Sequence, residues 1–343
     1  MEKQSLSNQS QVNAPSRLNE GGHYPTKDML ADMVKNFQAP VTRRAIRPGF
    51  IARTDGFNVD EMVENLENIP GKEAMLSRIL SVSDLTEKTY ERFAKNPNSL
   101  YNWYPAVERA LDKTDTELKS PDTKVMRLSI EMAQFIRLEY HEASQADKDL
   151  FNQFIFDQFG LEDGKTYFIK TGTFSSKFQF ANAKCYEPRE MGEYFQVINN
   201  FAMQVGAGQT VDLVVREYIE DVEENPTIYN GMPLRTEFRA FVDCDKDELI
   251  GVVPYWHPIV MKRALQAGLS ESIQQDYQTF LSHEETLVDE YNEHLHRVKK
   301  EIKALLPNLN LTGQYSIDVM KNGDDLYVID LALMSESALK ELL

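Results

Sequence analysis

The chain has 343 residues, of which 42% are apolar and 27% charged, and its formal net charge is −17. These values are typical of a globular protein with two domains or one elaborated domain. The acidic balance argues against general nucleic-acid binding, because neutralising phosphates needs a basic surface. Cys185 and Cys244 cannot by themselves build a disulfide framework or a zinc site. The sequence has no leader pattern and no apolar stretch of membrane-spanning length, so we expect a cytoplasmic protein without a membrane partner.

The first 160 residues predict a flexible arm, 1–24, followed by a mostly helical region, 25–160. The arm is rich in Ser, Asn and Gln. A basic cluster follows, made of Arg43, Arg44, Arg47 and Arg53. It either binds a phosphate or an acidic partner, or forms ion pairs with acidic residues of the protein itself. Apolar spacing predicts helices over 60–69, 72–82, 85–94, 125–142 and 145–159. An aromatic group predicts packing against a helix, with base stacking as the alternative: Tyr101, Trp103 and Tyr104.

The remaining residues, 161–343, show short β-type runs with helices between them. Strands are expected over 166–170, 177–182, 211–219, 236–242 and 248–254. Helices are expected over 189–204 and 270–305, and a terminal helix over 335–343. Strands joined by short turns and interrupted by helices predict the α+β class with antiparallel sheets.

A β-hairpin is predicted near the end of the chain. Two apolar runs, 315–320 and 326–331, flank a polar turn that contains Gly323. Each run carries one carboxylate, Asp318 in the first and Asp330 in the second. A hairpin can place two such groups side by side, where they repel unless a cation lies between them. Mg²⁺ held with a nucleotide phosphate is one solution, and a solvent-facing amphipathic hairpin is the other.

Three upstream segments carry further charge. The strand ending at Lys170 leads into a loop with Gly172, Ser175, Ser176 and Lys177, whose backbone N–H groups and lysines suit phosphate oxygens. The loop lacks the glycine spacing of Walker and dinucleotide-binding motifs, and an ordinary hairpin is the alternative reading. The run VVREYIED, 214–221, could offer backbone groups to an adenine edge, with an acid near the ribose. The run TEFRAFV, 236–242, continues a charged face that suits a phosphate: Arg235, Glu237 and Arg239.

In this order the segments resemble the ATP-grasp superfamily, and they cover roughly half of the chain. Within it they look most like the eukaryotic cell-division-cycle chaperone family that helps assemble translation initiation factor two, and its bacterial and viral relatives. The resemblance implies an ATP-grasp-like region over 161–343 with ATP and Mg²⁺ as cofactors. It implies phosphate contacts from the loop and two arginines: Lys170, Gly172, Ser175, Ser176, Lys177, Arg235 and Arg239. It implies an adenine and ribose hinge of Glu217, Ile219 and Asp221, and metal binding by Asp318 and Asp330.

The family usually has asparagine two residues after the second metal-binding acid, and this chain has Ala332 there. The implied metal site therefore lacks one ligand, unless Ser335 or Glu336 supplies it. Three functions stay open. The first is an ATP-dependent ligase that activates a carboxylate as an acyl phosphate, with Lys170 and Arg239 stabilising the phosphoryl group. The second is a nucleotide-binding assembly chaperone or interaction module without productive turnover. The third is a binding protein whose nucleotide site has decayed. The acceptor or protein partner is not encoded in any motif.

Overall fold

A computed structural model of the chain describes residues 59–82, 85–266 and 270–343. The predicted arm and the basic cluster from Arg43 to Arg53 lie outside these residues. The described residues form two compact units. The smaller unit comprises 59–82, 85–90 and 202–209, and the larger unit comprises 91–201, 210–266 and 270–343. The predicted division at residues 24 and 160 stays a prediction.

The smaller unit is helical. It contains α2 (Val59–Leu66), α3 (Glu73–Val82), the first residues of α4 (Glu87–Ala94) and the last residues of α8 (Met191–Val205). Its buried side chains include Val63 and Leu66, which lie three residues apart on one face of α2, and Leu80 on α3. Arg78 Nη1 donates a hydrogen bond to the carbonyl of Met203, 2.8 Å away, and so satisfies a carbonyl near the end of α8.

Helices of the larger unit begin and end where the sequence provides caps. Ser129 and Ser144 each accept a hydrogen bond from a backbone N–H three residues later, which starts α6 (Ile130–Gln134) and α7 (Gln145–Phe159). Gly160 adopts a left-handed conformation, φ 53°, and ends α7. A π-helical turn, Phe135–Glu139, continues α6. The other helices are α5 (Leu100–Lys113), α8, α9 (Pro258–Gln266) and α10 (Glu271–Leu309).

The larger unit contains a five-stranded sheet, a four-stranded sheet and a short ribbon. The five-stranded order is β1 (Leu118–Lys119), β11 (Asp325–Leu333), β10 (Gln314–Asn322), β8 (Glu237–Asp243) and β9 (Glu248–Pro254). The four-stranded order is β2 (Thr123–Arg127), β5 (Asp212–Glu217), β3 (Tyr167–Thr171) and β4 (Lys184–Cys185). The ribbon pairs β6 (Thr227–Ile228) with β7 (Met232–Pro233). Every pairing except β1 with β11 is antiparallel, which confirms the predicted α+β class.

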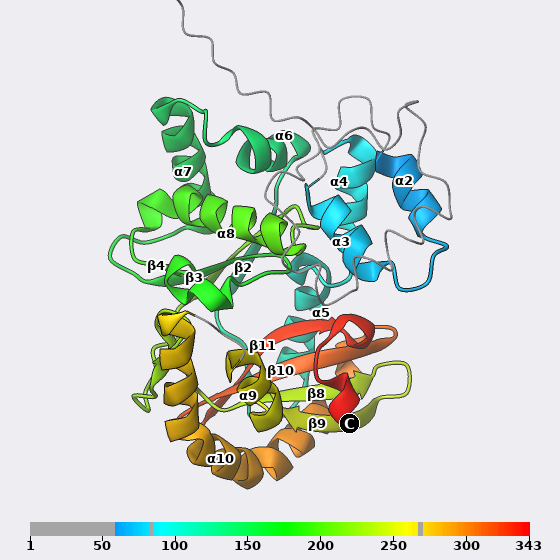
Figure 1. Cartoon of the computed structure of the whole chain (residues 1–343), viewed down its shortest axis with the longest axis vertical. Helices are drawn as coiled ribbons and strands as arrows, with labels where there is room; N and C mark the ends of the chain where they lie inside the picture. Colours follow the sequence, from blue (N-terminus) through cyan, green and yellow to red (C-terminus); the bar gives the residue numbers. More distant parts are fainter. Residues whose placement is uncertain (1–58, 83–84, 267–269) are drawn as a thin grey trace, which may run out of the picture. The chain divides into compact units, whose positions relative to one another are not determined.

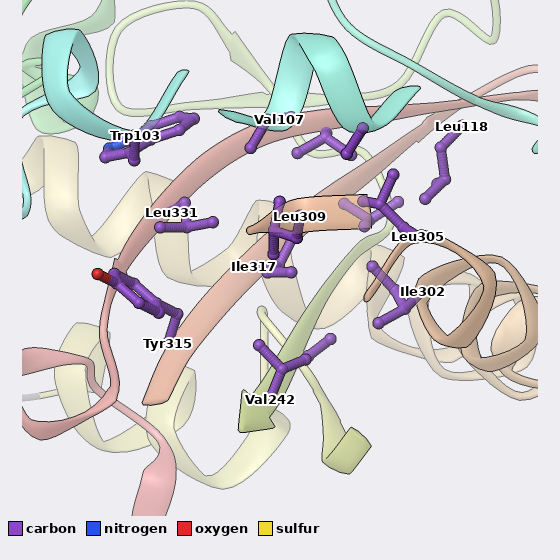
Figure 2. Packing of buried hydrophobic residues seen from close by; sticks show 14 of the residues in the cluster. Trp103, Val107, Leu118, Val242, Ile302, Leu305, Leu309, Tyr315, Ile317 and Leu331 are labelled. Atoms are coloured by element: carbon purple, nitrogen blue, oxygen red, sulfur yellow. The ribbon is translucent and has the colours of Figure 1, made fainter. Parts of the chain in front are cut away.

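One face of the five-stranded sheet is covered by α5 and α10 (Figure 1). Figure 2 shows Val107 from α5 and Leu305 from α10 among the buried side chains on this face, together with Ile317 from β10. Period-two alternation along the strands places apolar side chains here and turns the intervening polar residues toward the opposite face. This opposite face carries the charged residues of the predicted site.

A bulge in β11 decides which face Asp330 occupies. Val328 pairs with Val319 and Asp330 pairs with Asp318, so Ile329 has no partner in the register. Without the bulge, strict alternation would send Asp330 to the same face as Leu326 and Val328, both of which are buried in the core. The extra residue reverses the alternation and places Asp330 opposite Asp318.

Three predicted elements are wrong in detail. Residues 177–182 form a 3₁₀ helix, because the partner of β3 is β4 and Phe180 packs into a core with Leu234 and Phe280. The predicted helix over 125–142 begins as β2, where Val125 pairs with Val214. The aromatic group was predicted to pack against a helix, and Trp103 and Tyr104, which themselves lie within α5, are buried in the same core as Ile302 of α10. The C-terminal segment forms two short 3₁₀ turns, Met334–Glu336 and Lys340–Leu342.

None of the helices formed by the described residues combines the length and the apolar character needed to cross a lipid bilayer.

Replacing Ile317 with alanine should lower the free energy of unfolding by about 2–5 kcal/mol. Ile317 is fully buried between the sheet and its helices, so the substitution leaves a cavity as well as losing apolar burial. Leu150→Ala is the matched control, because Leu150 is 70% exposed, and it should change the free energy by no more than about 0.5 kcal/mol. Urea unfolding followed by circular dichroism measures both. Equal losses in the two variants would contradict this placement of the core.

Candidate functional site

A cavity of about 140 Å³ lies between the four-stranded and five-stranded sheets, within the larger unit. Aromatic side chains and one methionine line part of it: Phe168, Phe180, Tyr218, Met232, Tyr255 and Trp256. Charged side chains line another part: Lys170, Lys177, Arg216, Glu237, Asp318 and Asp330. A concave site with an apolar wall and a few convergent polar groups is the usual form of a small-ligand site.

Asp318 and Asp330 stand directly opposite each other on β10 and β11, as the hairpin predicts. Asp318 is buried, whereas the side chain of Asp330 is 42% exposed toward the cavity it lines. Mg²⁺ is usually held by one or two carboxylates together with substrate phosphates and water. The described residues contain no cluster of three or more His, Cys, Asp or Glu side chains that could hold a metal alone. The donor set therefore fits a cation that takes its other ligands from phosphate and water.

Each of these carboxylates forms an ion pair with a basic side chain. Arg239 donates two hydrogen bonds to Asp318, from Nε over 2.8 Å and from Nη2 over 2.7 Å. Lys170 Nζ lies 3.1 Å from Asp330 Oδ1. Arg239 also stacks on the ring of Tyr255, with its guanidinium carbon 4.6 Å from the centroid. The carboxylates are therefore neutralised by two of the residues predicted to contact phosphate.

Burial and charge act against each other on these groups. Burial outweighs the attraction of Asp330 and lowers the pKa of Lys170. Burial opposes the ionisation of Asp330, but the charges of Lys170 and Arg216 outweigh it and hold its pKa below the ordinary value. For Arg239 burial is outweighed by the Asp318 carboxylate, which raises its pKa. Glu237 is destabilised as an anion by burial and by Asp318, which raises its pKa to about 7.

The loop after β3 is held in place by backbone hydrogen bonds and close packing, unlike a flexible glycine loop. Gly172 is held between strands and helix, because its N–H donates to Asp212 O and its carbonyl accepts from Leu100 N. A Cβ on Gly172 would lie 2.0 Å from Ser99 Oγ, so only glycine fits there. Ser175 lines the cavity. Ser176 is buried and left-handed, with φ 52°.

Lys177 reaches the cavity from the start of the 3₁₀ helix. Its Nζ donates to Tyr255 Oη and lies 4.6 Å from the centroid of that ring and 5.7 Å from the centroid of Trp256. Burial opposes its charge, but Tyr255 and Glu237 outweigh burial and raise its pKa. No carboxylate of the described chain lies within ion-pair distance of it. Aromatic faces therefore hold this cation at the cavity wall.

Some residues of the predicted hinge line the cavity, whereas others are bound to neighbouring residues of the protein. Glu217 and Ile219 line the cavity. The N–H of Glu217 donates to Asp122 O over 2.9 Å, and the carbonyl of Ile219 accepts from Arg235 Nη2 over 2.8 Å. Arg235 lines the cavity but is bound to Asp221, with Nε 3.0 Å from Oδ1. Asp221 and Arg239 are not among the residues that line this cavity.

The position of the missing asparagine is Ala332, which pairs with Ser316. Neither of the proposed substitutes lines the cavity. Glu336 accepts a hydrogen bond from Asn98 Nδ2 over 2.6 Å, and the carbonyl of Ser335 accepts one from Lys340.

Arg216 lines the cavity, and the sequence analysis did not identify it as a candidate site residue. It lies in the middle of VVREYIED, one residue before the predicted hinge. Its one signal in the sequence is a charge within an otherwise apolar strand, where charged residues are rarely buried without a partner. Tyr255 and Trp256 were also missed, because they follow β9 and approach the cavity through the fold alone.

No family model matches the sequence, and no curated protein matches it. Among solved structures, one neighbour is Cdc123 from Schizosaccharomyces pombe, with 14% identity, 76% of this chain and 91% of that chain covered, and a TM-score of 0.44. Another is D-alanine–D-alanine ligase from Bacillus anthracis in complex with ATP, with 10% identity, coverages of 68% and 53%, and a TM-score of 0.31. L-amino acid ligase from Bacillus licheniformis has 11% identity, coverages of 90% and 55%, and a TM-score of 0.31.

These neighbours are of the two groups that the sequence motifs resemble, Cdc123 and the ATP-grasp ligases. At such TM-scores they carry no argument about activity.

Replacing Arg239 with methionine should lower the free energy of unfolding by about 3–5 kcal/mol, because it leaves the buried Asp318 carboxylate without its partner. Adding Asp318→Leu to this variant should restore most of the loss, since the unpaired buried carboxylate at position 318 is then removed as well. Urea unfolding of the two single variants and the double variant measures the coupling.

Arg189→Met is the matched control for this cycle. Its guanidinium pairs with Asp163 at the surface, where both side chains are more than half exposed, so the loss should be much smaller. Additive effects of Arg239→Met and Asp318→Leu would contradict the ion pair.

Proposed function

We propose that the cavity binds Mg²⁺ and ATP, and that the chain is an ATP-dependent ligase that activates a carboxylate. The observation that carries the proposal is the in-register pairing of Asp318 with Asp330, each bound to a cation, at the edge of a cavity with an aromatic wall. The wall suits a nucleotide base, since Phe168, Tyr218 and Met232 supply apolar contact area. The charged part suits the phosphates.

The two hairpin carboxylates and the two basic residues bound to them have defined tasks in this proposal. Asp318 and Asp330 would hold Mg²⁺, which when bound neutralises charge on phosphate oxygens. Lys170 and Arg239 would exchange their carboxylate partners for phosphate oxygens and stabilise the charge that develops on the transferring phosphoryl group. Lys170 is almost fully buried, so this charge stabilisation takes place in a site of low dielectric. Glu217 and Ile219 would contact the base from the end of β5.

The reaction needs no nucleophile from the protein. A carboxylate oxygen of the acceptor attacks the γ-phosphorus, the bond from that phosphorus to the β–γ bridging oxygen breaks, and ADP leaves. An amine then attacks the acyl carbon, loses a proton, and inorganic phosphate leaves. The protein's work is to position the reactants and exclude water, which supplies a large part of the acceleration of such transfers.

A second function is favoured by one observation. Among the described residues, Asp318 and Asp330 are joined by no third carboxylate that could complete a metal site, and Ala332 supplies no ligand. Such a site would bind nucleotide and metal but turn ATP over poorly. The chain would then act as an assembly or interaction protein that is ordered by nucleotide, with a protein partner in place of a small acceptor.

Asp330→Asn should weaken Mg²⁺-dependent binding of ATP at least about tenfold, because it removes one of the two charges that hold the metal. Titration calorimetry with ATP, in the presence of Mg²⁺ and in its absence, measures this on both proteins. Asp163→Asn is the control, since it removes the same charge from an exposed surface pair. Absence of ATP binding to the wild-type protein would overturn both functions.

Carboxylate-dependent release of ADP separates the two functions. The protein is incubated with Mg²⁺, ATP, hydroxylamine as the amine and pools of amino acids as carboxylates. A ligase releases ADP and forms a hydroxamate from one pool, and Lys170→Met abolishes both, because the phosphoryl group loses a buried cation. Binding of ATP without ADP release from any pool favours the interaction protein.

A further inference from the structure

The segment that follows β11, residues 334–343, packs on the charged face of the five-stranded sheet, and we call it the strap. Its second half, red in Figure 1, lies beside β8 and β9. Leu339 of the strap is 4% exposed and packs with Phe241 of β8 and Val253 of β9. Neither of these two strand residues lines the cavity. The strap therefore covers a part of the charged face that lies outside the cavity.

Arg239 lies between the cavity and the strap. Side chains two residues apart on a strand share a face, so Glu237, Arg239 and Phe241 lie on one side of β8. Glu237 lines the cavity, whereas Phe241 packs against the strap. The guanidinium of Arg239 donates from Nε and Nη2 to Asp318, and from Nη1 to the carbonyl of Ala338 in the strap over 3.2 Å. One side chain therefore links the charged hairpin to the strap.

The residue after this carbonyl has an unfavourable backbone conformation. The φ of Leu339 is 72°, in the left-handed region that a bulky side chain rarely adopts. Packing of its side chain against Phe241 and the bond from Arg239 to Ala338 offset this strain. Loss of the bond from Arg239 should therefore favour release of this part of the strap.

The start of the strap is fixed independently of Arg239. The hydroxyl of Ser337 lies 2.6 Å from the hydroxyl of Ser316 on β10. Glu336 accepts a hydrogen bond from the Asn98 amide, which precedes α5. These contacts can persist when the arginine moves, so the part of the strap that its movement would release is 338–343.

We propose that the strap competes with ATP for Arg239 and is an autoinhibitory contact. The inference rests on the proposed function, in which Arg239 leaves Asp318 for a phosphate oxygen. The same movement breaks the bond to Ala338, so binding of ATP releases 338–343 from the sheet. Conversely, a closed strap weakens the apparent affinity for ATP, because only the molecules with an open strap are competent to bind.

Releasing the strap by mutation should tighten the binding of ATP. Leu339→Ala removes the apolar anchor and keeps the unfavourable φ, so 338–343 should exchange amide hydrogens at least about tenfold faster. The variant should bind ATP with Mg²⁺ at least about threefold more tightly, because Arg239 is then available to the ligand. A strap that only stabilises the sheet would leave the affinity unchanged or weaken it, and either result would overturn the inference.

Hydrogen-exchange mass spectrometry of the peptide 334–343 and titration calorimetry with ATP and Mg²⁺ measure these effects on the full chain. Saturation of the wild-type protein with ATP and Mg²⁺ should itself speed the exchange of 338–343. Leu150→Ala is the control for the lost apolar group, because Leu150 is 70% exposed, and it should match the wild type in both measurements.

Arg239→Lys tests the link to the strap without any ligand, and it decides the question if Leu339→Ala does not fold. Lysine keeps the charge beside Asp318 but lacks the planar fork that also reaches Ala338. Residues 338–343 should then exchange at least about tenfold faster, because a charge-assisted hydrogen bond is lost. Arg189→Lys, in an exposed pair with Asp163, is the matched control and should exchange like the wild type. Wild-type exchange in Arg239→Lys would mean that packing alone holds the strap.

The strap and the proposed function can fail separately. If ATP binds in an Asp330-dependent way but changes neither the exchange of 338–343 nor its own affinity in Leu339→Ala, the proposed function stands and the inference is wrong. If ATP does not bind while Arg239→Lys opens the strap, the nucleotide assignment is wrong and the control of the strap by Arg239 stands.

Discussion

The arrangement of the site depends on one irregularity, the bulge at Ile329 in β11. It turns Asp330 away from the apolar face of the sheet and places it opposite Asp318. It also frees the carbonyl that Arg216 binds. A bulge costs one ladder pairing, and it is retained where it aims a side chain at a site. Here it aims a carboxylate and a guanidinium into the same cavity.

The apolar core on the opposite face of the five-stranded sheet stabilises this arrangement of charged groups. Helices α5 and α10 bury the apolar side chains of β8, β10 and β11, as Figure 2 shows around Ile317 and Leu305. Apolar burial supplies the stability that burying charged groups consumes. The charged face can therefore hold ion pairs that contribute little net stability by themselves. Their use is to keep each group in a defined position before a ligand arrives.

Charge complementarity links the free and the ligand-bound site. Asp318 and Asp330 are bound to Arg239 and Lys170. Under the proposed function, a metal that takes the carboxylates would release these two cations for phosphate. Binding of metal and binding of anion should therefore favour each other, because each supplies the partners that the other displaces. Arg216 lies outside this exchange, since it forms an ion pair with neither carboxylate and donates instead to the carbonyl of Ile329.

The sequence by itself determined the α+β class, most element positions and the hairpin that carries Asp318 and Asp330, because period-two and helical spacing and turn residues are local signals. The tertiary structure alone decided the rest. It showed Phe178 to Phe180 in a 3₁₀ helix, since the packing of Phe180 overrides local strand propensity. It brought Arg216 and Trp256 to the cavity, and it located the bulge. These features depend on contacts between residues distant in sequence, which no local pattern records.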